Sequence, residues 1–473
     1  MYAGSDNVKV RALINGVIRE KEYASPVNAL SALADLGAQV YAPCGGKGVC
    51  GKCAVHIEGE YEPFSRSGDA LACQTLITGN SYIIYNTSLG KIQVQKANDV
   101  NEIMPCPEES GYGTAIDIGT TTLAAAVYDL KAGKLVSTSG VPNPQSVHGA
   151  DIVSRMEFAS CGGAGTLKRE IESAVNALSW SGRRVITGNT AMMCFLRGAD
   201  TSSMRAWPFE TPEKFGYEEN DTYYAPCADA FFGADAVCAA AHCIKENEPC
   251  IVADIGTNGE LACWDGERMV CCSASAGPCF EGGGIERGMP ACGGAVCAVR
   301  SNGTRAEYDV IDGVPPTGLC GTGIADLAVY LLETKKMSAD GLLPRTYHLT
   351  DEAYITQADV RALMLAKSAV RAGIEILLDV TKTRGKIQKL YLAGGFGSAI
   401  SPRTAAKLGL IPPDMEDICV KCGNAALSGA SRALTDAEFR KKLEETAAKC
   451  KYIHLAQNES FEKLFIKHMR FGG

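Results

Sequence analysis

The first hundred residues contain short stretches in which apolar and polar positions alternate. Such alternation is typical of half-buried strands, whereas one segment has the wider apolar spacing of a helix. The predicted strands are 8–13, 17–21, 54–57 and 82–85, and the predicted helix is 26–36. A loop rich in Gly and Cys separates the helix from the later strands. We therefore expect a compact first domain at residues 1–96.

The stretch ANDVNEIMPCPEESG, residues 97–111, interrupts this pattern. It is polar, carries two prolines and has no periodicity, as linkers do. A flexible chain of that length spans roughly 20 Å, so a tethered domain could visit more than one docking position. We place a linker at 97–112 and a second, larger domain at 113–473.

Strands and helices alternate from residue 114 onward, which predicts α/β architecture. The segments AIDIGTTTLAAAVYD (115–129) and ADIGTNGELACWD (253–265) share an apolar strand, Asp-Ile-Gly-Thr, a tight polar turn and a returning apolar strand. This duplication predicts two related lobes, about 113–250 and 251–473, that face each other. Helices are expected over 357–382 and 436–449, and a strand over 389–393.

Composition narrows the class of protein. The 473 residues are 46% hydrophobic, enough for two to four domains with filled cores. A formal net charge of −8 disfavours binding to nucleic acid or to anionic membranes. The start of the chain lacks a signal pattern, and no apolar run approaches the roughly 20 residues of a membrane helix, so we expect a cytoplasmic protein. In that compartment the 21 cysteines are better candidates for metal ligands or buried thiols than for a disulfide framework.

Cysteine spacing gives the most specific chemical signal. Cys44, Cys50 and Cys53 lie in PCGGKGVCGKC, and Cys73 follows in ALACQT. Four thiolates at plant-type spacing can hold two irons tetrahedrally, and glycine lets backbone N–H groups approach the sulfurs. The alternatives are a zinc site, which usually has two separated C-x2-C pairs, and unligated cysteines. Residues 46–53 also approach a phosphate-binding P-loop, but two of its positions are better explained as iron ligands.

The remaining cysteines and histidines show no comparable pattern. Cys419 and Cys422 form a C-x2-C pair with no second pair outside the first loop, which favours buried thiols over a second metal site. The same interpretation is given to Cys271 and Cys272. The histidines His56, His148 and His242 show no ligand spacing and are assigned no role.

The two repeated turns have the chemistry of a phosphate-binding site. Asp117 and Asp254 each end a buried strand and are followed by a glycine turn with hydroxyl or amide side chains. Backbone N–H groups and hydroxyls in such turns bind phosphates, and paired aspartates can hold hydrated magnesium and orient an attacking water. One such turn also occurs as a plain strand end, but two in register favour a nucleotide cleft.

Two glycine-rich segments can complete this cleft. GLCGTG, residues 318–323, precedes an apolar helical stretch at 324–332, and AGGFG, residues 393–397, follows a strand. Glycine there lets the backbone approach adenosine and phosphate closely. Each segment alone could be a structural turn, and neither has the G-x-G-x-x-G order of a dinucleotide fold.

Taken together, these motifs resemble those of the reductive activators of corrinoid proteins, which are ATPases of the acetate and sugar kinase, heat-shock chaperone and actin superfamily with an N-terminal ferredoxin domain. The resemblance covers nearly the whole chain. Its further marks are NPQSVHGADIVSRM (143–156), TGNTAM (187–192), SASAGPCFEGGGIERGM (273–289) and FEKLFIKHMRF (461–471). It implies an N-terminal β-grasp ferredoxin-like domain followed by a two-lobed actin-like ATPase with duplicated ribonuclease-H-like subdomains.

The resemblance also implies which residues form the sites. The four loop cysteines would hold the iron of a [2Fe-2S] cluster, and Asp117 and Asp254 would be catalytic and bind Mg²⁺ through water. The residues expected to bind ATP are Gly119, Thr120, Thr121, Thr122, Asn189, Thr190, Gly256, Thr257, Asn258, Gly259, Gly321, Thr322, Gly323, Gly394, Gly395 and Gly397. For the loop 273–289, a surface that meets the corrinoid partner and a purely structural role both stay open.

Members of this family reduce the inactive Co(II) corrinoid of a methyltransferase partner to Co(I), using ATP binding or hydrolysis. A plant-type cluster has a potential near −400 mV, and each 100 mV uphill costs about 2.3 kcal/mol per electron, which a nucleotide-linked conformational change can offset. The resemblance thus implies an ATPase coupled to low-potential electron transfer, of a kind suited to anaerobic cells. Its expected partners are a corrinoid protein, an upstream electron donor of unknown identity and a second copy of the chain in a homodimer.

Other functions stay open beside this one. The acceptor could be another low-potential enzyme, although activators of radical dehydratases share a [4Fe-4S] cluster between subunits, unlike the separate cysteine loop here. A non-catalytic redox sensor would bind nucleotide without ATPase activity stimulated by an acceptor. A small-molecule kinase would have no need of an electron carrier. Longer family members carry a middle domain between ferredoxin and ATPase, and we expect this chain to have only the short linker there.

Overall fold

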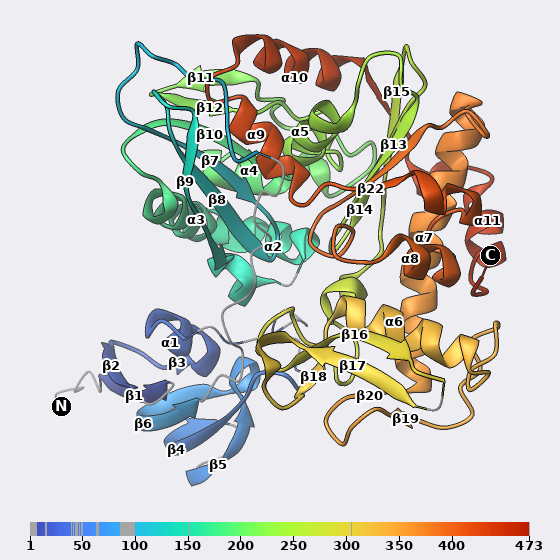
Figure 1. Cartoon of the computed structure of the whole chain (residues 1–473). Coiled ribbons are helices and arrows are strands. Elements are labelled where there is room, and N and C mark those ends of the chain that lie inside the picture. Colours follow the sequence, from blue (N-terminus) through green and yellow to red (C-terminus); the bar gives the residue numbers. More distant parts are fainter. Residues whose placement is uncertain are drawn as a thin grey trace.

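The chain folds into three units, each built around a β-sheet. The computed structural model describes residues 7–14, 17–38, 40, 42, 46, 48, 51–62, 66–85, 100–149, 151–303 and 305–472. Figure 1 shows a small sheet domain in blue, a first lobe in cyan to green above it, and a second lobe in yellow to red beside them. Among the described residues, no helix is long and apolar enough to cross a membrane.

The first unit is a sheet covered by one helix. Its elements are β1 (Val8–Ile14), β2 (Val17–Tyr23), β3 (Val27–Asn28), α1 (Ala29–Asp35), β4 (Ala54–Glu62), β5 (Arg66–Leu71) and β6 (Leu76–Tyr85). The sheet order is β2-β1-β6-β4-β5, with β1 antiparallel to β2 and parallel to β6. Leu30 and Leu33 bury one face of α1 in the core of this unit, and the Asn28 side chain caps the helix by accepting from the Leu30 N–H. The predicted β-grasp arrangement is confirmed.

The first lobe contains a mixed six-stranded sheet with helices packed against it. Its elements are β7 (Tyr112–Ile118), β8 (Thr122–Asp129), β9 (Lys134–Pro142), α2 (Ile152–Phe158), α3 (Ala164–Leu178), β10 (Gly182–Gly188), α4 (Thr190–Arg197), β11 (Tyr217–Glu219), β12 (Thr222–Tyr224) and α5 (Ala234–Cys243). The order is β11-β12-β10-β7-β8-β9, in which β7, β8 and β9 are antiparallel and β10 and β12 are parallel to β7. The central place of β7 explains why residues 113–116 are all buried.

The second lobe repeats this sheet and carries an insertion. Its sheet and helices are β13 (Cys250–Ile255), β14 (Gly259–Trp264), β15 (Met269–Ala274), α7 (Gln357–Thr381), β21 (Lys389–Ala393), α8 (Pro402–Leu408), β22 (Cys419–Lys421), α9 (Ala425–Arg432), α10 (Ala437–Lys449), β23 (Cys450–Tyr452) and α11 (Phe461–Lys467). The inserted elements are β16 (Ala295–Ser301), β17 (Ala306–Val310), β18 (Gly318–Leu319), α6 (Gly321–Glu333), β19 (Tyr347–His348) and β20 (Tyr354–Ile355). The main sheet has the order β22-β21-β13-β14-β15-β23.

The two lobes share one topology. In each, an antiparallel meander (β7-β8-β9 or β13-β14-β15) is extended beyond its first strand by two parallel strands (β10 and β12, or β21 and β22). The repeated sequence segments form the first hairpin of each meander. The prediction of duplicated ribonuclease-H-like lobes is therefore confirmed.

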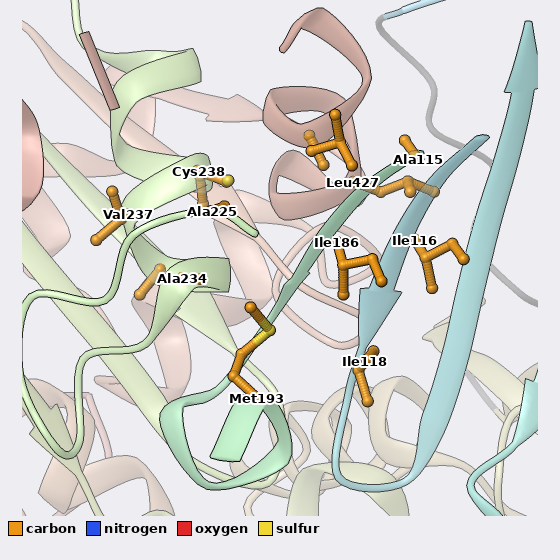
Figure 2. Packing of buried hydrophobic residues seen from close by; sticks show 14 of the residues in the cluster. Ala115, Ile116, Ile118, Ile186, Met193, Ala225, Ala234, Val237, Cys238 and Leu427 are labelled. Carbon is orange, nitrogen blue, oxygen red and sulfur yellow. The ribbon is translucent and has the colours of Figure 1, made fainter. Parts of the chain in front are cut away.

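The lobes are joined by two helices that cross. α9 comes from the end of the chain but packs on β7 and β10 of the first lobe, while α5 also contacts β13 and β14. Figure 2 shows Leu427 of α9 and Cys238 of α5 in one cluster with Ile116 and Ile186 of the first sheet. At the crossing, a Cβ on Gly429 would lie 2.4 Å from the Cys238 carbonyl oxygen. The core thus continues from one lobe into the other.

The described part of the predicted linker packs on the first lobe. Val100 and Ile103 are buried, the Ile103 N–H donates to the Gly133 carbonyl at 2.8 Å, and the Tyr128 hydroxyl donates to the Val100 carbonyl at 2.6 Å. Residues 97–99 lie outside the described residues. From residue 100 onward the segment is therefore bound to the β8–β9 hairpin and is not a free tether, because its few apolar side chains bury there.

One cysteine prediction is wrong. Cys271 on β15 is bonded to Cys450 of β23 in a disulfide, with the two Cα atoms 6.5 Å apart. No local sequence pattern indicates this pairing, because β23 joins the sheet from a distant part of the chain. Cys272 is a buried thiol, as predicted. Cys419 and Cys422 are not in a disulfide either, and Cys422 is the more buried of the two.

Replacing Gly429 by alanine is expected to lower the unfolding free energy by about 1–3 kcal/mol, because the added methyl group overpacks the crossing of α5 and α9. The matched control is Gly165→Ala at the exposed second position of α3, where a Cβ would lie 3.4 Å from the flexible end of Arg169. Alanine favours helix there and should be neutral or stabilising. Denaturant unfolding measures both variants. Equal stability of the two would contradict the close approach of the helices.

Candidate functional site

The two repeated turns lie face to face between the lobes. Each turn is closed by its own backbone: the Gly119 N–H donates to the Thr122 carbonyl at 3.0 Å, and the Gly256 N–H donates to the Asn258 carbonyl at 2.9 Å. The hydroxyls of Thr121 and Thr257, one from each turn, both donate to the same carboxylate oxygen of Glu281, at 3.0 and 2.8 Å. The repeat thus brings two phosphate-type turns to one cleft.

Four carboxylates from both lobes lie near the two turns and interact with one another electrostatically. Burial raises the pKa of Asp117 to about 6, and burial together with the Asp117 charge raises the pKa of Asp254 to about 7. Burial and neighbouring carboxylates also hold the pKa values of Asp235 and Glu260 well above their usual range. Asp235, in the first turn of α5, was not singled out from the sequence because it belongs to neither repeat.

This donor set fits a hydrated divalent cation. Carboxylate oxygens are the ligands that Mg²⁺ prefers, and Mg²⁺ commonly keeps several waters and few protein ligands. Within the described residues, no three acidic, cysteine or histidine side chains are close enough to share one ion directly.

Two asparagines, each at the start of a helix, reach the first turn. Asn189 caps α4 by accepting from the Met192 N–H at 3.0 Å and donates its amide to the Thr120 hydroxyl at 3.1 Å. Asn424 caps α9 and donates its amide to the Asp117 carboxylate at 3.0 Å. The sequence analysis missed Asn424. GNTAM at 188–192 and GNAAL at 423–427 both place Gly-Asn at the start of a helix, although they follow non-equivalent strands, β10 and β22.

Residues of the motif at 143–156 hydrogen-bond to the backbone carbonyls of the first turn. The Asn143 amide donates to the Gly119 carbonyl at 2.8 Å, and the Asn143 N–H donates to the Thr121 carbonyl at 2.8 Å. The buried Arg155 guanidinium donates to the Thr120 carbonyl at 2.7 Å. With its carbonyls held from this side, the turn keeps its N–H groups and hydroxyls available to the cleft.

Several predicted site residues point into the protein. The Thr190 hydroxyl donates to the Asp229 carbonyl at 2.7 Å, and the Thr322 hydroxyl donates to the Cys297 carbonyl at 2.7 Å. Gly259 is buried against Val370. Contacts within the protein therefore account for the residue types at these three positions.

The two glycine-rich segments differ in how closely the rest of the protein packs against their glycines. A Cβ would lie 1.9 Å from the Phe280 carbonyl oxygen at Gly321 and 2.0 Å from the Val296 carbonyl oxygen at Gly323. A Cβ on Gly394 would reach the Asp254 carboxylate, at 2.3 Å, whereas Gly395 is exposed with open space where a side chain would be. Close approach of the protein's own backbone thus explains the first segment, and the second segment borders the cleft.

The described part of the cysteine loop fits a cluster site. Cys53 and Cys73 are both buried, and the Ala72 N–H donates to the Cys53 carbonyl at 2.9 Å, which brings the two segments together. The Gln74 amide donates to the Cys73 sulfur at 3.7 Å and also to the Gly46 carbonyl. Gly46, Gly48 and Gly51 have φ angles of +81°, +73° and +68°, which favour glycine. Cys44 and Cys50 lie outside the described residues.

The iron–sulfur unit touches both lobes of the ATPase. Lys52, the neighbour of Cys53, donates its ammonium to the carbonyls of Glu286 and Gly288 in the second lobe, at 3.2 Å for Gly288. Val147 of the first lobe packs against the core of the small domain. In Figure 1 the blue domain lies beneath the first lobe and beside β18.

This combination defines a class: an ATPase of the acetate and sugar kinase, heat-shock protein and actin type, joined to an iron–sulfur domain. Three family models match the chain: "2Fe-2S iron-sulfur cluster binding domain" at 13–78, "RACo middle region" at 112–245, and "C-terminal domain of RACo the ASKHA domain" at 248–472. The chain belongs to the RACo family of corrinoid reductive activators. It contains an iron–sulfur domain and a nucleotide-binding ASKHA domain.

Individual relatives are distant but cover most of the chain. Corrinoid activation enzyme RamQ of Eubacterium limosum is 25% identical over 444 residues, covering 80% of this chain and 74% of the relative. The [Co(II) methylated amine-specific corrinoid protein] reductase of Methanosarcina barkeri is 24% identical over 421 residues, covering 76% and 77%. The solved structure of a reductive activator for corrinoid, iron–sulfur protein covers 98% of both chains with a TM-score of 0.69 at 23% identity, which shows the common fold.

The model of the RACo middle region covers the first lobe. It matches residues 112–245, which supply the first phosphate turn. The region that the family model calls the middle region is therefore, in this chain, the first of the two lobes with the shared topology.

Replacing Asp254 by asparagine is expected to flatten the pH dependence of stability in the absence of nucleotide and magnesium. The folded chain retains a proton on Asp254 up to about pH 7, whereas an unfolded aspartate loses it near pH 4, so wild-type stability falls as the pH rises through this window. Asp254→Asn should remove a fall on the order of 4 kcal/mol between pH 4 and 7.5. Denaturant unfolding at both pH values measures it, with exposed Glu267→Gln as control. An unchanged pH profile in Asp254→Asn would contradict the raised pKa.

Proposed function

We propose that this chain is an ATP-dependent reductive activator that passes an electron from a [2Fe-2S] cluster to the Co(II) corrinoid of a methyltransferase partner and so regenerates Co(I). The observation that carries the proposal is the presence, in one chain, of a two-sided phosphate cleft and an iron–sulfur domain in direct contact with the ATPase lobes. Two relatives, named a corrinoid activation enzyme and a Co(II) corrinoid protein reductase, support the same acceptor.

Different residues of the cleft would bind the phosphates of ATP, hold magnesium and orient the attacking water. Thr120, Thr121 and Thr257 offer hydroxyls, and the two turns offer backbone N–H groups, to the phosphates. Asp117 and Asp254 hold magnesium through water and orient the attacking water. The other predicted turn residues shape the two hairpins, and the exposed Gly395 leaves room for adenosine.

The four loop cysteines would hold a cluster that supplies one electron at low potential. Gln74 directs an amide toward the Cys73 sulfur, and such hydrogen bonds stabilise added negative charge there. The electron reduces Co(II) to Co(I), and an upstream donor replaces it. A homodimer, which rests on the family resemblance, and a cytoplasmic location are further parts of the proposal.

The decisive experiment follows a Co(II) corrinoid protein spectroscopically under anaerobic conditions, with reductant, in the presence and absence of Mg-ATP. We expect Co(I) to accumulate only with ATP. Cys53→Ser should lose the cluster signal in electron paramagnetic resonance and the reduction together, whereas Cys161→Ser, an exposed cysteine of the first lobe, should retain both. Asp254→Ala should keep the cluster but lose ATP-dependent reduction.

Two results would contradict the proposal. Co(I) formation independent of ATP would remove the energetic coupling. Nucleotide binding without reduction of any corrinoid partner, despite an intact cluster, would favour another low-potential acceptor, or a sensor if no acceptor stimulates the ATPase.

A further inference from the structure

Glu281 occupies the point at which the two phosphate turns meet. One of its carboxylate oxygens accepts from Thr121 of the first lobe and from Thr257 of the second. The other oxygen lies 3.6 Å from the place where a Cβ on Gly256 would be. A carboxylate therefore satisfies the same hydroxyl donors that the turns would offer to a phosphate.

Glu281 belongs to a compact loop, residues 278–289, which we call the bridging segment. The Gly283 N–H donates to the Pro278 carbonyl at 2.8 Å, and the Gly288 N–H donates to the Ile285 carbonyl at 3.1 Å. Gly282 and Gly288 are in close contact, since a Cβ on Gly288 would lie 2.1 Å from the Gly282 carbonyl oxygen. Because its two ends pack on each other, a displacement of Glu281 is passed to residues 286–288.

The far side of the bridging segment holds the iron–sulfur unit. The Lys52 ammonium donates to the carbonyls of Glu286 and Gly288, and the next residue is the cluster ligand Cys53. Phe280, one residue before Glu281, stacks on Phe396 of the second glycine-rich segment, with ring centroids 4.3 Å apart. One short loop thus touches the phosphate turns, the segment expected beside adenosine and the neighbour of a cluster ligand.

We propose that Glu281 closes the cleft when no nucleotide is bound, and that the phosphates of ATP displace its carboxylate and thereby move the bridging segment and its contact with Lys52. Glu281 is on this view a positioning residue, which links nucleotide state to the placement of the iron–sulfur unit. The inference rests on the proposed function to the extent that the cleft binds ATP and the cysteine loop holds the cluster.

The direction of the effect follows from charge. A carboxylate and a triphosphate are both anionic and compete for Thr121 and Thr257, so the two cannot occupy the junction of the turns together. Linkage then requires reciprocity: if nucleotide weakens the contact between Lys52 and the bridging segment, loss of that contact must strengthen nucleotide binding by the same factor.

The test measures two quantities that need neither a corrinoid partner nor electron transfer. One is the Kd of the full chain for a non-hydrolysable ATP analogue with magnesium. The other is hydrogen–deuterium exchange of residues 282–289, with and without that analogue. In the wild-type chain we expect exchange in 282–289 to rise on binding.

Two variants and two matched controls make the test specific. Glu281→Gln keeps the size of the side chain but removes its charge, and should bind the analogue roughly fivefold tighter or more, with exchange in 282–289 already raised before the analogue is added. Lys52→Met should also bind it more tightly. The controls are Glu352→Gln, which removes a surface partner of Arg287 on the same segment, and Lys9→Met, which removes a lysine paired with Glu20 within the iron–sulfur unit. Both should bind like the wild type.

Failure of this inference differs from failure of the proposed function. If saturating analogue leaves exchange in 282–289 unchanged, or if Glu281→Gln matches the wild type in both quantities, the inference is overturned even when the wild-type chain reduces Co(II) with ATP. If 282–289 responds as expected but no corrinoid is reduced, the link stands and only the acceptor is wrong.

Discussion

Acidic side chains are buried between the two sheets, and the groups around them must compensate for the loss of water. Asp117 and Asp254 stand at the ends of equivalent central strands, and Asp235 and Glu260 lie near them. Removing such groups from water is unfavourable unless donors or cations compensate. The Asn424 amide compensates Asp117 in part, and the raised pKa values of the group show that the compensation is incomplete.

Side chains from one lobe hydrogen-bond to site residues of the other lobe. Asn424, at the start of α9 near the end of the chain, donates to Asp117 of the first lobe, and Glu281 of the second lobe accepts from Thr121 of the first. The two connections differ in kind. α9 is held against α5 at Gly429 by backbone packing, which has little room to adjust, whereas Glu281 is held by hydroxyl donors that a stronger anion can take. One connection between the lobes, α9 on α5, is therefore rigid, and the other, Glu281 on the two turns, can be replaced by another anion.

Sequence alone predicted the parts that repeat. The Asp-Ile-Gly-Thr segments predicted the two lobes and the two turns, and the cysteine spacing predicted the iron ligands, because in both cases local chemistry and spacing coincide. The β-grasp fold of the first unit was implied by the family resemblance. Prediction failed where a role depends on contacts distant in sequence. Nothing local shows that Cys450 meets Cys271, or that Glu281 reaches both turns.

The remaining differences have local physical reasons. Gly321 and Gly323 were expected beside adenosine because glycine permits close approach, but the groups that approach are carbonyls of the protein itself. The polar segment after residue 99 was expected to be free, yet burial of Val100 and Ile103 holds it on the first lobe. In both cases the sequence shows that a close approach or a burial is possible, and only the three-dimensional fold shows which group makes the contact.

The size of the free energies favours a graded switch over an all-or-none change. Complete inversion of a two-state equilibrium from 1:99 to 99:1 needs about 5.5 kcal/mol of differential binding. Hydrogen bonds to a charged carboxylate contribute roughly 1.5–3 kcal/mol each, and the triphosphate regains most of what Glu281 loses. Within the described part of the chain, the iron–sulfur unit meets the lobes through the Lys52 ammonium on two carbonyls, the packing of Val147 and the contact of α1 with residues 144–148. A coupling of about 1–3 kcal/mol is enough to change how often the Lys52 contact forms. An electron carrier that must meet its donor and its acceptor in turn benefits from that arrangement, because tight docking in either position would slow the exchange.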